Sequence, residues 1–283
     1  MPGPDSHDRA MITLASDFGS PYPAAMKGVV LDRLGDADAD VRLVDVAHDL
    51  PRQDVRAAAF WLREVLPWFP PAVHLVVVDP GVGTDRAALV VRAGEHALVG
   101  PDNGVLVPAA RALASAGRDR PVETDASNAR DDPFEVFEVA VDDPASHTFH
   151  GRDVFAPAAA AVHEAGVEQL HDLVVLSPAD GHVDLRFPEP TVRDGEATGE
   201  VLVVDGFGNA ITNLPGSVLA GRYGGGVEVG DELAPVRRSY AMVDAGERVV
   251  TVGSHGNVEL AVNRGRGDVA FGVEAGSTVR LSW

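Results

Sequence analysis

The segment with the clearest chemical potential runs from Val73 to Arg86, where a largely apolar stretch ends in Asp79 and an arginine follows seven residues later. An apolar run of this kind predicts a strand that is buried on both faces, as in parallel sheets. Asp79 would then lie at the carboxyl edge of the sheet, where open α/β folds place their ligands. The glycines of the turn, Gly81 and Gly83, would let the backbone approach a ligand closely. This segment alone is equally compatible with a binding site and with a tight strand exit whose Asp and Arg are solvated.

Five further polar clusters stand where strands end or turns begin. They are residues 16–19 (Ser-Asp-Phe-Gly), 101–104 (Pro-Asp-Asn-Gly), 149–153 (Phe-His-Gly-Arg-Asp), 205–213 (Asp-Gly-Phe-Gly-Asn-Ala-Ile-Thr-Asn) and 253–257 (Gly-Ser-His-Gly-Asn). Taken singly, each favours a turn, since Pro-Asp-Asn-Gly is a common turn composition. The chain lacks a glycine-rich phosphate loop, a G-x-S-x-G elbow and an H-E-x-x-H motif. The carboxylates with His150 match no metal-ligand spacing, so we predict no metal site.

The elements that would position these clusters alternate between strand and helix in the first two thirds of the chain. We predict strands near residues 11–14, 41–46, 73–78, 87–91 and 96–99, and helices over 24–34, 53–66 and 151–165. This alternation indicates an α/β domain with a central, mostly parallel sheet over residues 11–188, after a disordered tail of residues 1–10. We interpret residues 117–132 as an exposed loop.

The pattern changes after Pro188-Glu189-Pro190. From there, β-branched runs are separated by glycine turns, near residues 200–204, 225–229, 248–252, 258–262 and 278–281. Because no long helical pattern interrupts them, residues 197–283 are predicted to form an all-β, barrel-like domain.

Composition limits the partners and the compartment. The 283 residues include no cysteine, which excludes disulfides and thiolate catalysis, and the net charge of −20 argues against nucleic acid or an anionic membrane as a partner. Acidic residues are scattered along the chain, so we favour a halophilic surface, adapted to a salty cytoplasm, over steering of a cationic ligand. No apolar run approaches the ~20 residues of a membrane span, and the polar N-terminus lacks a signal-peptide pattern, so we expect a cytoplasmic protein.

Six motifs in one order, between residues 11 and 281, resemble those of the S-adenosyl-L-methionine (SAM) hydroxide adenosyltransferases, or SAM hydrolases, which are relatives of the fluorinase and chlorinase. They are residues 16–19, Met-Lys-Gly at 26–28, Val-Val-Asp-Pro-Gly-Val-Gly-Thr at 77–84, Gly-Pro-Asp-Asn-Gly at 100–104, Phe-His-Gly-Arg-Asp-Val-Phe-Ala-Pro at 149–157 and Asp-x-Phe-Gly-Asn-x-x-Thr-Asn at 205–213. The resemblance implies an α/β domain followed by a β-barrel, and a homotrimer with sites between neighbouring subunits. It also implies that SAM is the substrate, that water converts it to adenosine and L-methionine, and that no cofactor is needed.

The resemblance also assigns roles to individual residues. It assigns the handling of water to Asp79, Arg86 and His150, and the binding of the ribose hydroxyls to Asp17. The residues that it places around adenine and methionine are Asp205, Phe207, Asn209, Ser254 and, on the backbone, Val262. The loop after Gly19 lacks two residues of the family pattern, including an aspartate, so Asp205 or Glu259 is the candidate partner for the α-amino group of methionine.

Chemistry suggests how the first three residues divide the work. His150 is the candidate base, because histidine titrates near neutrality. Arg86 would stabilise oxyanion character as it develops, while Asp79 would orient the water or His150.

Several alternatives remain open at this point. A halide-dependent adenosyltransferase is disfavoured because the halogenases carry Tyr in place of Asp79, and the fluorinase carries Thr in place of Val82. The chain could instead be a non-catalytic SAM- or adenosine-binding protein, or a metal-dependent phosphoesterase built on Asp17, Asp79 and His150. The candidate site residues also have purely structural interpretations. Asp79 and Arg86 could be a buried ion pair with His150 as a capping residue. Asp17 could be a cap before a helix, and Phe207 and Asn209 could belong to a hairpin turn.

Overall fold

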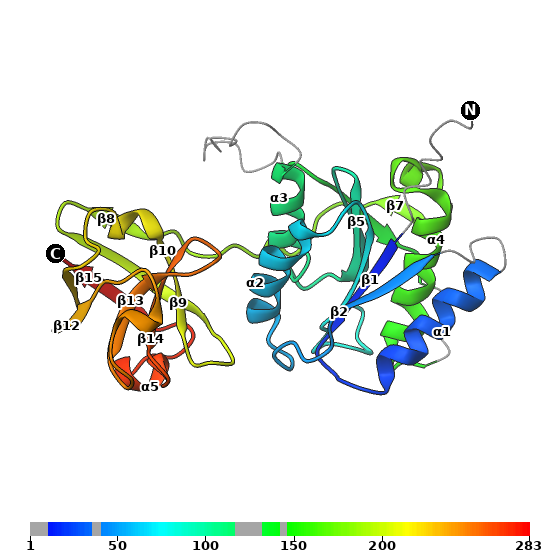
Figure 1. Ribbon diagram of the computed structural model, residues 1–283. Helices are drawn as coiled ribbons and strands as arrows, with labels where there is room; N and C mark the ends of the chain where they lie inside the picture. The colour runs from blue at the N-terminus through cyan, green and yellow to red at the C-terminus, as the bar shows by residue number, and fades with distance from the viewer. Residues whose placement is uncertain (1–10, 36–40, 117–131, 142–145) are drawn as a thin grey trace, which may run out of the picture. The chain divides into compact units, whose positions relative to one another are not determined.

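The computed structural model describes residues 11–35, 41–116, 132–141 and 146–283. The chain divides into two compact units, Met1–Leu185 and Arg186–Trp283 (Figure 1). The predicted tail of residues 1–10 and nearly all of the predicted loop of residues 117–132 lie outside the described residues. Among the residues described, no helix has both the length and the apolar character needed to cross a membrane.

The described strands of the first unit form one seven-stranded sheet in the order β2-β1-β3-β5-β4-β6-β7. They are β1 (Met11–Ser16), β2 (Arg42–Ala47), β3 (Val73–Val77), β4 (Ala88–Ala93), β5 (His96–Pro101), β6 (Glu135–Val139) and β7 (Leu176–Pro178). Strands β2, β1, β3 and β5 are parallel, and the pairs from β5 to β7 are antiparallel. The sheet is therefore mixed, because only two residues join β4 to β5 and a parallel pair needs a longer crossover.

Helices cover both faces of this sheet (Figure 1). Helices α1 (Tyr22–Leu34) and α4 (Ala156–Ala165) pack together on one face, and α2 (Val55–Val65) and α3 (Val107–Ala116) pack on the other. Alternate residues of β1 and β3, such as Leu14 and Leu75, join the apolar core beneath α1 and α4. Helix α3 is absent from the predicted elements, because its short Ala-rich sequence directly follows the turn at 101–104.

The predicted helix over residues 151–165 has two parts. Its first turn, Gly151–Phe155, is π-helical, and the backbone N–H of Ala156 donates to the carbonyl of Gly151. Pro157, in the first turn of α4, has no N–H to give to the carbonyl four residues earlier. The regular α-helical ladder is interrupted there, so the chain can take the wider π turn at the position that follows His150.

The described strands of the second unit form an eight-stranded antiparallel sheet. They are β8 (Thr191–Arg193), β9 (Glu196–Val204), β10 (Ala210–Pro215), β11 (Gly226–Val229), β12 (Glu232–Pro235), β13 (Arg248–Val252), β14 (Asn257–Val262) and β15 (Thr278–Ser282). A bridge between Val236 and Val250 links the β12 end of the sheet to β13, so the sheet is nearly closed. This arrangement confirms the predicted α/β and barrel-like fold classes. The short helix α5 (Gly267–Phe271) packs on β14.

A histidine is buried in the sheet of the first unit. His74 on β3 has no exposed surface; its Nδ1 lies 2.7 Å from the Thr13 hydroxyl and its Nε2 lies 2.9 Å from Nδ1 of His96. Burial, helped by the neighbouring His96, lowers the pKa of His74 from 6.5 to about 3. The native state therefore holds His74 neutral at mildly acidic pH.

We expect this burial to weaken the fold in acid. As the pH falls from 6.5 toward 3, His74 binds a proton in the unfolded chain but stays neutral in the native state. The free energy of unfolding then falls by up to ~1.4 kcal/mol per pH unit from this group. Urea titrations at several pH values should show a shallower acid slope for His74→Gln than for wild type. The exposed residue His171 provides the control, and a His74→Gln slope equal to that of His171→Gln would contradict the assignment.

Candidate active site

The predicted polar clusters of the first unit meet at one edge of the sheet. Strands β1, β3 and β5 are parallel, and Ser16, the last residue of β1, is paired in register with Val77, the last residue of β3. The segments beginning at Asp17 and Val78 therefore leave the sheet side by side. This is the carboxyl edge, where ligands of open α/β folds bind.

Asp79 and Arg86 form an ion pair at this edge. Nη1 of Arg86 lies 2.5 Å from Oδ1 of Asp79, and the side chain of Asp79 is only 6% exposed. The same oxygen accepts the backbone N–H of Gly81 at 3.1 Å. Oδ2 of Asp79 accepts no hydrogen bond from the part of the chain that the structure describes, so it can still accept one from a ligand.

The two glycines of the turn make different contacts. A Cβ on Gly81 would lie 2.2 Å from Nη2 of Arg86, so the guanidinium rests directly against this residue. Gly83 has φ +82°, and a Cβ there would lie 2.6 Å from the carbonyl oxygen of His147. The first glycine makes room for Arg86, and the second admits the segment that leads to His150.

His150 reaches the same edge through the packing of its neighbours. A Cβ on Gly151 would lie 2.9 Å from Sδ of Met26 and 3.3 Å from a methyl of Val77, so the π-helical turn starts against the end of β3. His150 itself is partly buried. Among the described residues, no hydrogen bond or ion pair joins it to Asp79 or Arg86.

Three aromatic rings connect the two polar segments of this edge. Phe18, next to Asp17, and Phe149, next to His150, have ring centroids 5.9 Å apart at 90°. The ring of Tyr22 meets Phe18 at 6.1 Å and Phe149 at 5.4 Å, again edge to face. Edge-to-face contacts of this kind are favourable. This aromatic trio, Phe18, Tyr22 and Phe149, holds the segments of Asp17 and His150 together.

Asp17 is bound to the start of α2. Its Oδ2 accepts the backbone N–H of Gln53 at 2.6 Å, and Gln53 has a left-handed backbone with φ +58°. A left-handed backbone is rare for a residue other than glycine. Asp17 does not cap α1: the N-cap residue is Pro21, and it makes no side-chain cap hydrogen bond.

The remaining polar residues of this edge support the turns. The amide of Asn103 donates to the carbonyl of Val78 at 2.8 Å and accepts the N–H of Val105 at 3.1 Å. The carboxylate of Asp102 accepts the N–H of Val183 at 2.8 Å. Arg152 forms two hydrogen bonds with Asp153, at 2.6 and 2.8 Å. These residues act within the fold, as the turn interpretation of Asp102 and Asn103 predicts.

In the second unit, three predicted residues lie on the hairpin between β9 and β10. Oδ1 of Asp205 accepts the N–H groups of Phe207 and Asn209 at 2.9 and 2.8 Å, while Oδ2 accepts the Asn209 amide at 2.9 Å. This confirms the hairpin-turn interpretation of the local structure. Phe207 stands at the tip with 81% of its surface exposed, so its ring is available to a ligand or to another chain.

The other predicted residues of this unit lie on the hairpin of β13 and β14 and at its end. Ser254 is exposed in the turn, whereas Val262 is buried as the last residue of β14. Glu259 is buried: the Tyr240 hydroxyl donates to its Oε2, and Nε2 of His255 lies 3.0 Å from its Oε1. Burial, the hydrogen bond to Glu259 and the charges of Glu259 and Asp205 raise the pKa of the Tyr240 hydroxyl, which therefore stays protonated as a donor.

Two structural features around the candidate residues escape the sequence patterns. The partners of Glu259 are one: His255 follows Ser254 in a predicted cluster, but Tyr240 has no nearby motif to mark it. The aromatic trio is the other, and its only signal is that Phe18 and Phe149 each stand beside a candidate polar residue. No group of three or more His, Asp or Glu that could hold a metal ion occurs among the residues described.

We expect the Tyr240 hydroxyl to stabilise the second unit. In Tyr240→Phe, the buried carboxylate of Glu259 keeps only its contact with His255, and losing a hydrogen bond to a buried charge should cost about 1–3 kcal/mol. Chemical denaturation measures this difference. Tyr223→Phe is the control, because its hydroxyl makes no hydrogen bond within the described residues. Equal unfolding free energies for the two variants would argue against a buried Tyr240–Glu259 bond.

Comparison with known proteins finds matches along nearly the whole chain. Residues 12–173 match the family model of the SAM hydroxide adenosyltransferase N-terminal domain, and residues 199–280 match that of the C-terminal domain. The chain is 42% identical over 282 residues to an "(R)-S-adenosyl-L-methionine hydrolase" of Thermus thermophilus, covering 94% of this chain and 97% of that protein. A protein of Salinispora tropica with the same name is 38% identical over 277 residues, covering 96% and 97%. The crystal structure of an uncharacterized conserved protein from Thermotoga maritima matches with a TM-score of 0.76 and 29% identity, covering 96% of this chain and all of that one.

Proposed function

The chain belongs to the SAM hydroxide adenosyltransferase family, and from this premise we propose that it is a hydrolase that converts S-adenosyl-L-methionine and water to adenosine and L-methionine. The observation that carries the proposal is the Asp79–Arg86 pair at the carboxyl edge of the sheet, with one oxygen of Asp79 left to accept a hydrogen bond. The names of the Thermus and Salinispora relatives support it, and they specify the (R) epimer of the sulfonium.

The proposed reaction is a displacement at C5′ of the ribose. The oxygen of water forms a bond to C5′ while the bond from C5′ to sulfur breaks, and its electron pair goes to sulfur. Methionine leaves as a neutral thioether, and the attacking water loses one proton. Because the leaving group needs no protonation, the residues only have to place the water in line and accept that proton.

We propose that His150 accepts the proton of the attacking water and that Asp79 and Arg86 hold this water in place. Lowering the pKa of water from about 15.7 to 7 requires about 12 kcal/mol. One guanidinium at about 4 Å supplies only about 4 kcal/mol at an effective dielectric of 20. Arg86, whose charge is already paired with Asp79, therefore cannot lower the pKa of water enough to form a hydroxide before the attack. The water loses its proton during the attack, with Arg86 stabilising the charge that develops on oxygen.

The substrate contacts extend this proposal to both units. Asp17 accepts hydrogen bonds from the ribose hydroxyls, for which a carboxylate is well suited. Phe207 stacks on adenine, Asn209 bonds its edge, and Ser254 and the backbone at Val262 bind nearby. Support comes from the exposure of Phe207 and Ser254. Asp205 is the better candidate for the α-amino group of methionine, because it is partly exposed and its Oδ2 accepts only the Asn209 amide, whereas Glu259 is buried between Tyr240 and His255.

The proposal also covers assembly and setting. We propose a homotrimer whose neighbouring subunits share each site, acting without a cofactor in a cytoplasm of high salt content. Family resemblance supports the trimer, and the net charge of −20 with scattered acidic residues supports the salt adaptation. Light scattering on the purified protein tests the assembly directly, and a monomeric enzyme with full activity would exclude shared sites.

The central test is product formation from SAM. The purified protein is incubated with each sulfonium epimer in high-potassium buffer made with H₂¹⁸O, with or without a chelator and with chloride or bromide present. We expect equal amounts of adenosine and methionine, preference for the (R) epimer, and ¹⁸O in the 5′-hydroxyl of adenosine. Absence of adenosine would defeat the proposal. A 5′-halogenated nucleoside would instead indicate a halide-dependent transferase, and loss of activity with the chelator would indicate a metal enzyme.

The base is tested by His150→Ala at saturating SAM. Loss of general base catalysis should lower kcat by about 10²-fold or more. His171→Ala, which removes an exposed histidine, is the matched control and should retain full activity. Unchanged kcat in His150→Ala would remove this residue from the mechanism.

Gly81→Ala should separate activity from stability. The three atoms nearest to the new Cβ all belong to the guanidinium of Arg86, which is the flexible end of a side chain, so we expect the fold to accept the Cβ while the ion pair with Asp79 cannot stay in place. We expect kcat to fall at least tenfold with a nearly unchanged melting temperature. Gly181→Ala, where a Cβ meets no atom within 4 Å, is the control. Full activity in Gly81→Ala would show that the ion pair is dispensable.

A further inference from the structure

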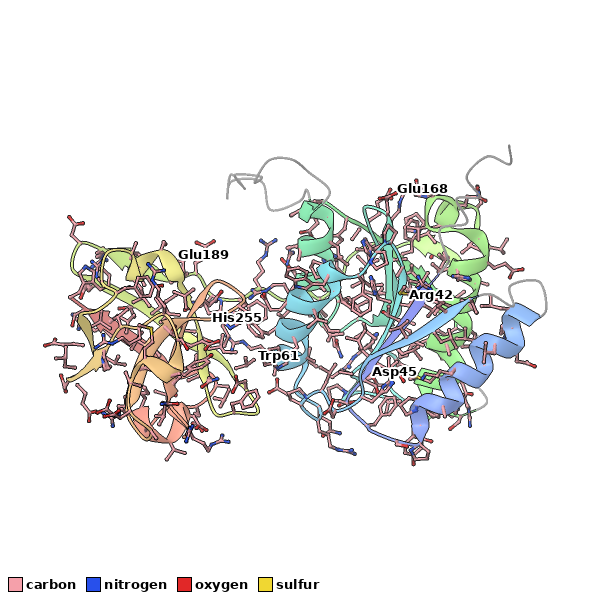
Figure 2. All side chains as sticks on the ribbon, viewed as in Figure 1. Arg42, Asp45, Trp61, Glu168, Glu189 and His255 are labelled. Carbon is pink, nitrogen blue, oxygen red and sulfur yellow. The ribbon has the colours of Figure 1, made fainter. Side chains whose placement is uncertain are left out.

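Four side chains beside the candidate site form a continuous hydrogen-bonded chain that none of the proposed catalytic roles uses. The Ser16 hydroxyl at the end of β1 lies 2.7 Å from Nδ1 of His48, and Nε2 of His48 lies 2.9 Å from Oδ1 of Asp45 on β2. Oδ2 of Asp45 accepts Nζ of Lys27, from α1, at 2.6 Å. Asp45 is labelled in Figure 2, on the strand that faces α1. Below, Lys27, Asp45, His48 and Ser16 are called the Lys27 relay.

Charge determines the direction of the hydrogen bonds in the Lys27 relay. Burial alone would raise the pKa of the Asp45 carboxyl, but the hydrogen bonds and charges of Lys27 and His48 outweigh it, and the pKa is lowered. Asp45 is therefore a carboxylate that accepts the N–H at Nε2 of His48. In the neutral ring, Nδ1 then accepts the proton of the Ser16 hydroxyl. The carboxylate thus sets the tautomer of His48, and through it the orientation of Ser16.

The order Ser-His-Asp has the form of a nucleophile triad, but the burial of Ser16 excludes that use. Ser16 has no exposed surface, and its hydroxyl stands at the end of a central strand. A nucleophile must contact its substrate, so a buried hydroxyl cannot fill that role. The Lys27 relay instead acts on the backbone that follows Ser16.

That backbone carries Asp17, and the backbone of residues 48–50 holds it from both sides. The carbonyl of His48 accepts the N–H of Gly19 at 2.8 Å, and the carbonyl of Ser16 accepts the N–H of Leu50 at 3.2 Å. Asp17 lies between these anchors, and its own carboxylate is held by the N–H of Gln53. The segment after β2 therefore contacts the Asp17 turn through the backbone before it, the backbone after it and the side chain itself.

We propose that His48 is a positioning residue that fixes the carboxylate of Asp17 for the ribose hydroxyls, with Asp45 and Lys27 locking its ring. The inference rests on the proposed function, because it takes the nucleoside part of SAM as the ligand of Asp17. It explains why a lysine appears here in a chain whose other fixed cations are all arginine. A compact ammonium completes the relay with a single hydrogen bond to Asp45.

The test measures discrimination between ligands with and without ribose hydroxyls. Calorimetry gives the Kd of the full-length protein for adenosine and for 2′,3′-dideoxyadenosine. The Kd for the dideoxy compound divided by the Kd for adenosine reports the contribution of the hydroxyls to binding. We expect Ser16→Ala and His48→Gln to lower this ratio at least tenfold. His48→Asn should retain most of it, since the Asn amide can replace Nδ1 towards Ser16. Asp45→Asn should also lower the ratio, because the amide no longer fixes the tautomer of His48. Asp32→Asn, on the exposed side of α1, is its control for the lost charge.

A second arm asks whether the effect passes through Asp17. In an Asp17→Ala background, adding Ser16→Ala should change the ratio less than twofold, because the group that it positions is gone. Ser16→Ala with the wild-type ratio, or with the same loss in both backgrounds, would overturn the positioning role. Circular dichroism confirms that each variant is folded.

The results of these experiments distinguish a failure of the proposed function from a failure of the positioning role. A wild-type protein that releases adenosine from SAM, but whose relay variants keep the full ratio, overturns the positioning role alone. A wild-type protein that releases no adenosine, but prefers adenosine over its dideoxy analogue through the Lys27 relay, overturns hydrolysis and supports the positioning role.

Discussion

The register of β1 with β3 is the constraint on which the candidate site depends. Because Ser16 is paired with Val77, the two strands end level, and the chain leaves both at the same height. Asp17 and Asp79 therefore start from neighbouring points even though they are sixty-two positions apart in the sequence. A shift of one residue would turn the side chains of one strand to its opposite face and separate Thr13 from His74. These two buried polar residues are paired in this register with a 2.7 Å contact, so their contact protects the alignment.

Around this edge, each polar group is held by a contact of a different kind. An ion pair holds Arg86 against Asp79, a backbone N–H holds Asp17, and aromatic packing brings the segment of His150 into place. The hydrogen bonds within the turns leave one oxygen of Asp79 available. Preorganisation of this sort matters for a reaction in which water must be held in line, since placing the reactants supplies much of the rate.

Hydrophobic pattern predicts most of the first unit, because buried parallel strands and amphipathic helices have distinct periods. It also predicts that Asp79 follows a buried strand. The Pro-Asp-Asn-Gly composition, and not the hydrophobic pattern, predicts that Asp102 and Asn103 act within a turn. The hydrophobic pattern does not predict the antiparallel half of the sheet, which depends on the short connection between β4 and β5. The π-helical turn before α4 depends on a missing N–H at Pro157, which residue type shows but periodicity does not.

Contacts between distant segments are harder to predict from the sequence. The pairing of Tyr240 with Glu259 and of Lys27 with Asp45 depends on three-dimensional neighbours, and single residues give no sign of them. The roles of Phe207 and Asn209 show the same limit. Their hairpin follows from the local sequence, whereas any ligand contact requires groups that lie outside the hairpin.

The aromatic trio has a consequence for a protein of such high charge. Between exposed groups, charge attraction is screened within about 3 Å at molar salt. The contact of Phe18, Tyr22 and Phe149 is apolar, and excluded salts strengthen apolar burial. The distance between the segments of Asp17 and His150 is thus set by a force that salt does not weaken. The geometry of this edge can stay constant across ionic strengths that would loosen many of the surface ion pairs around it.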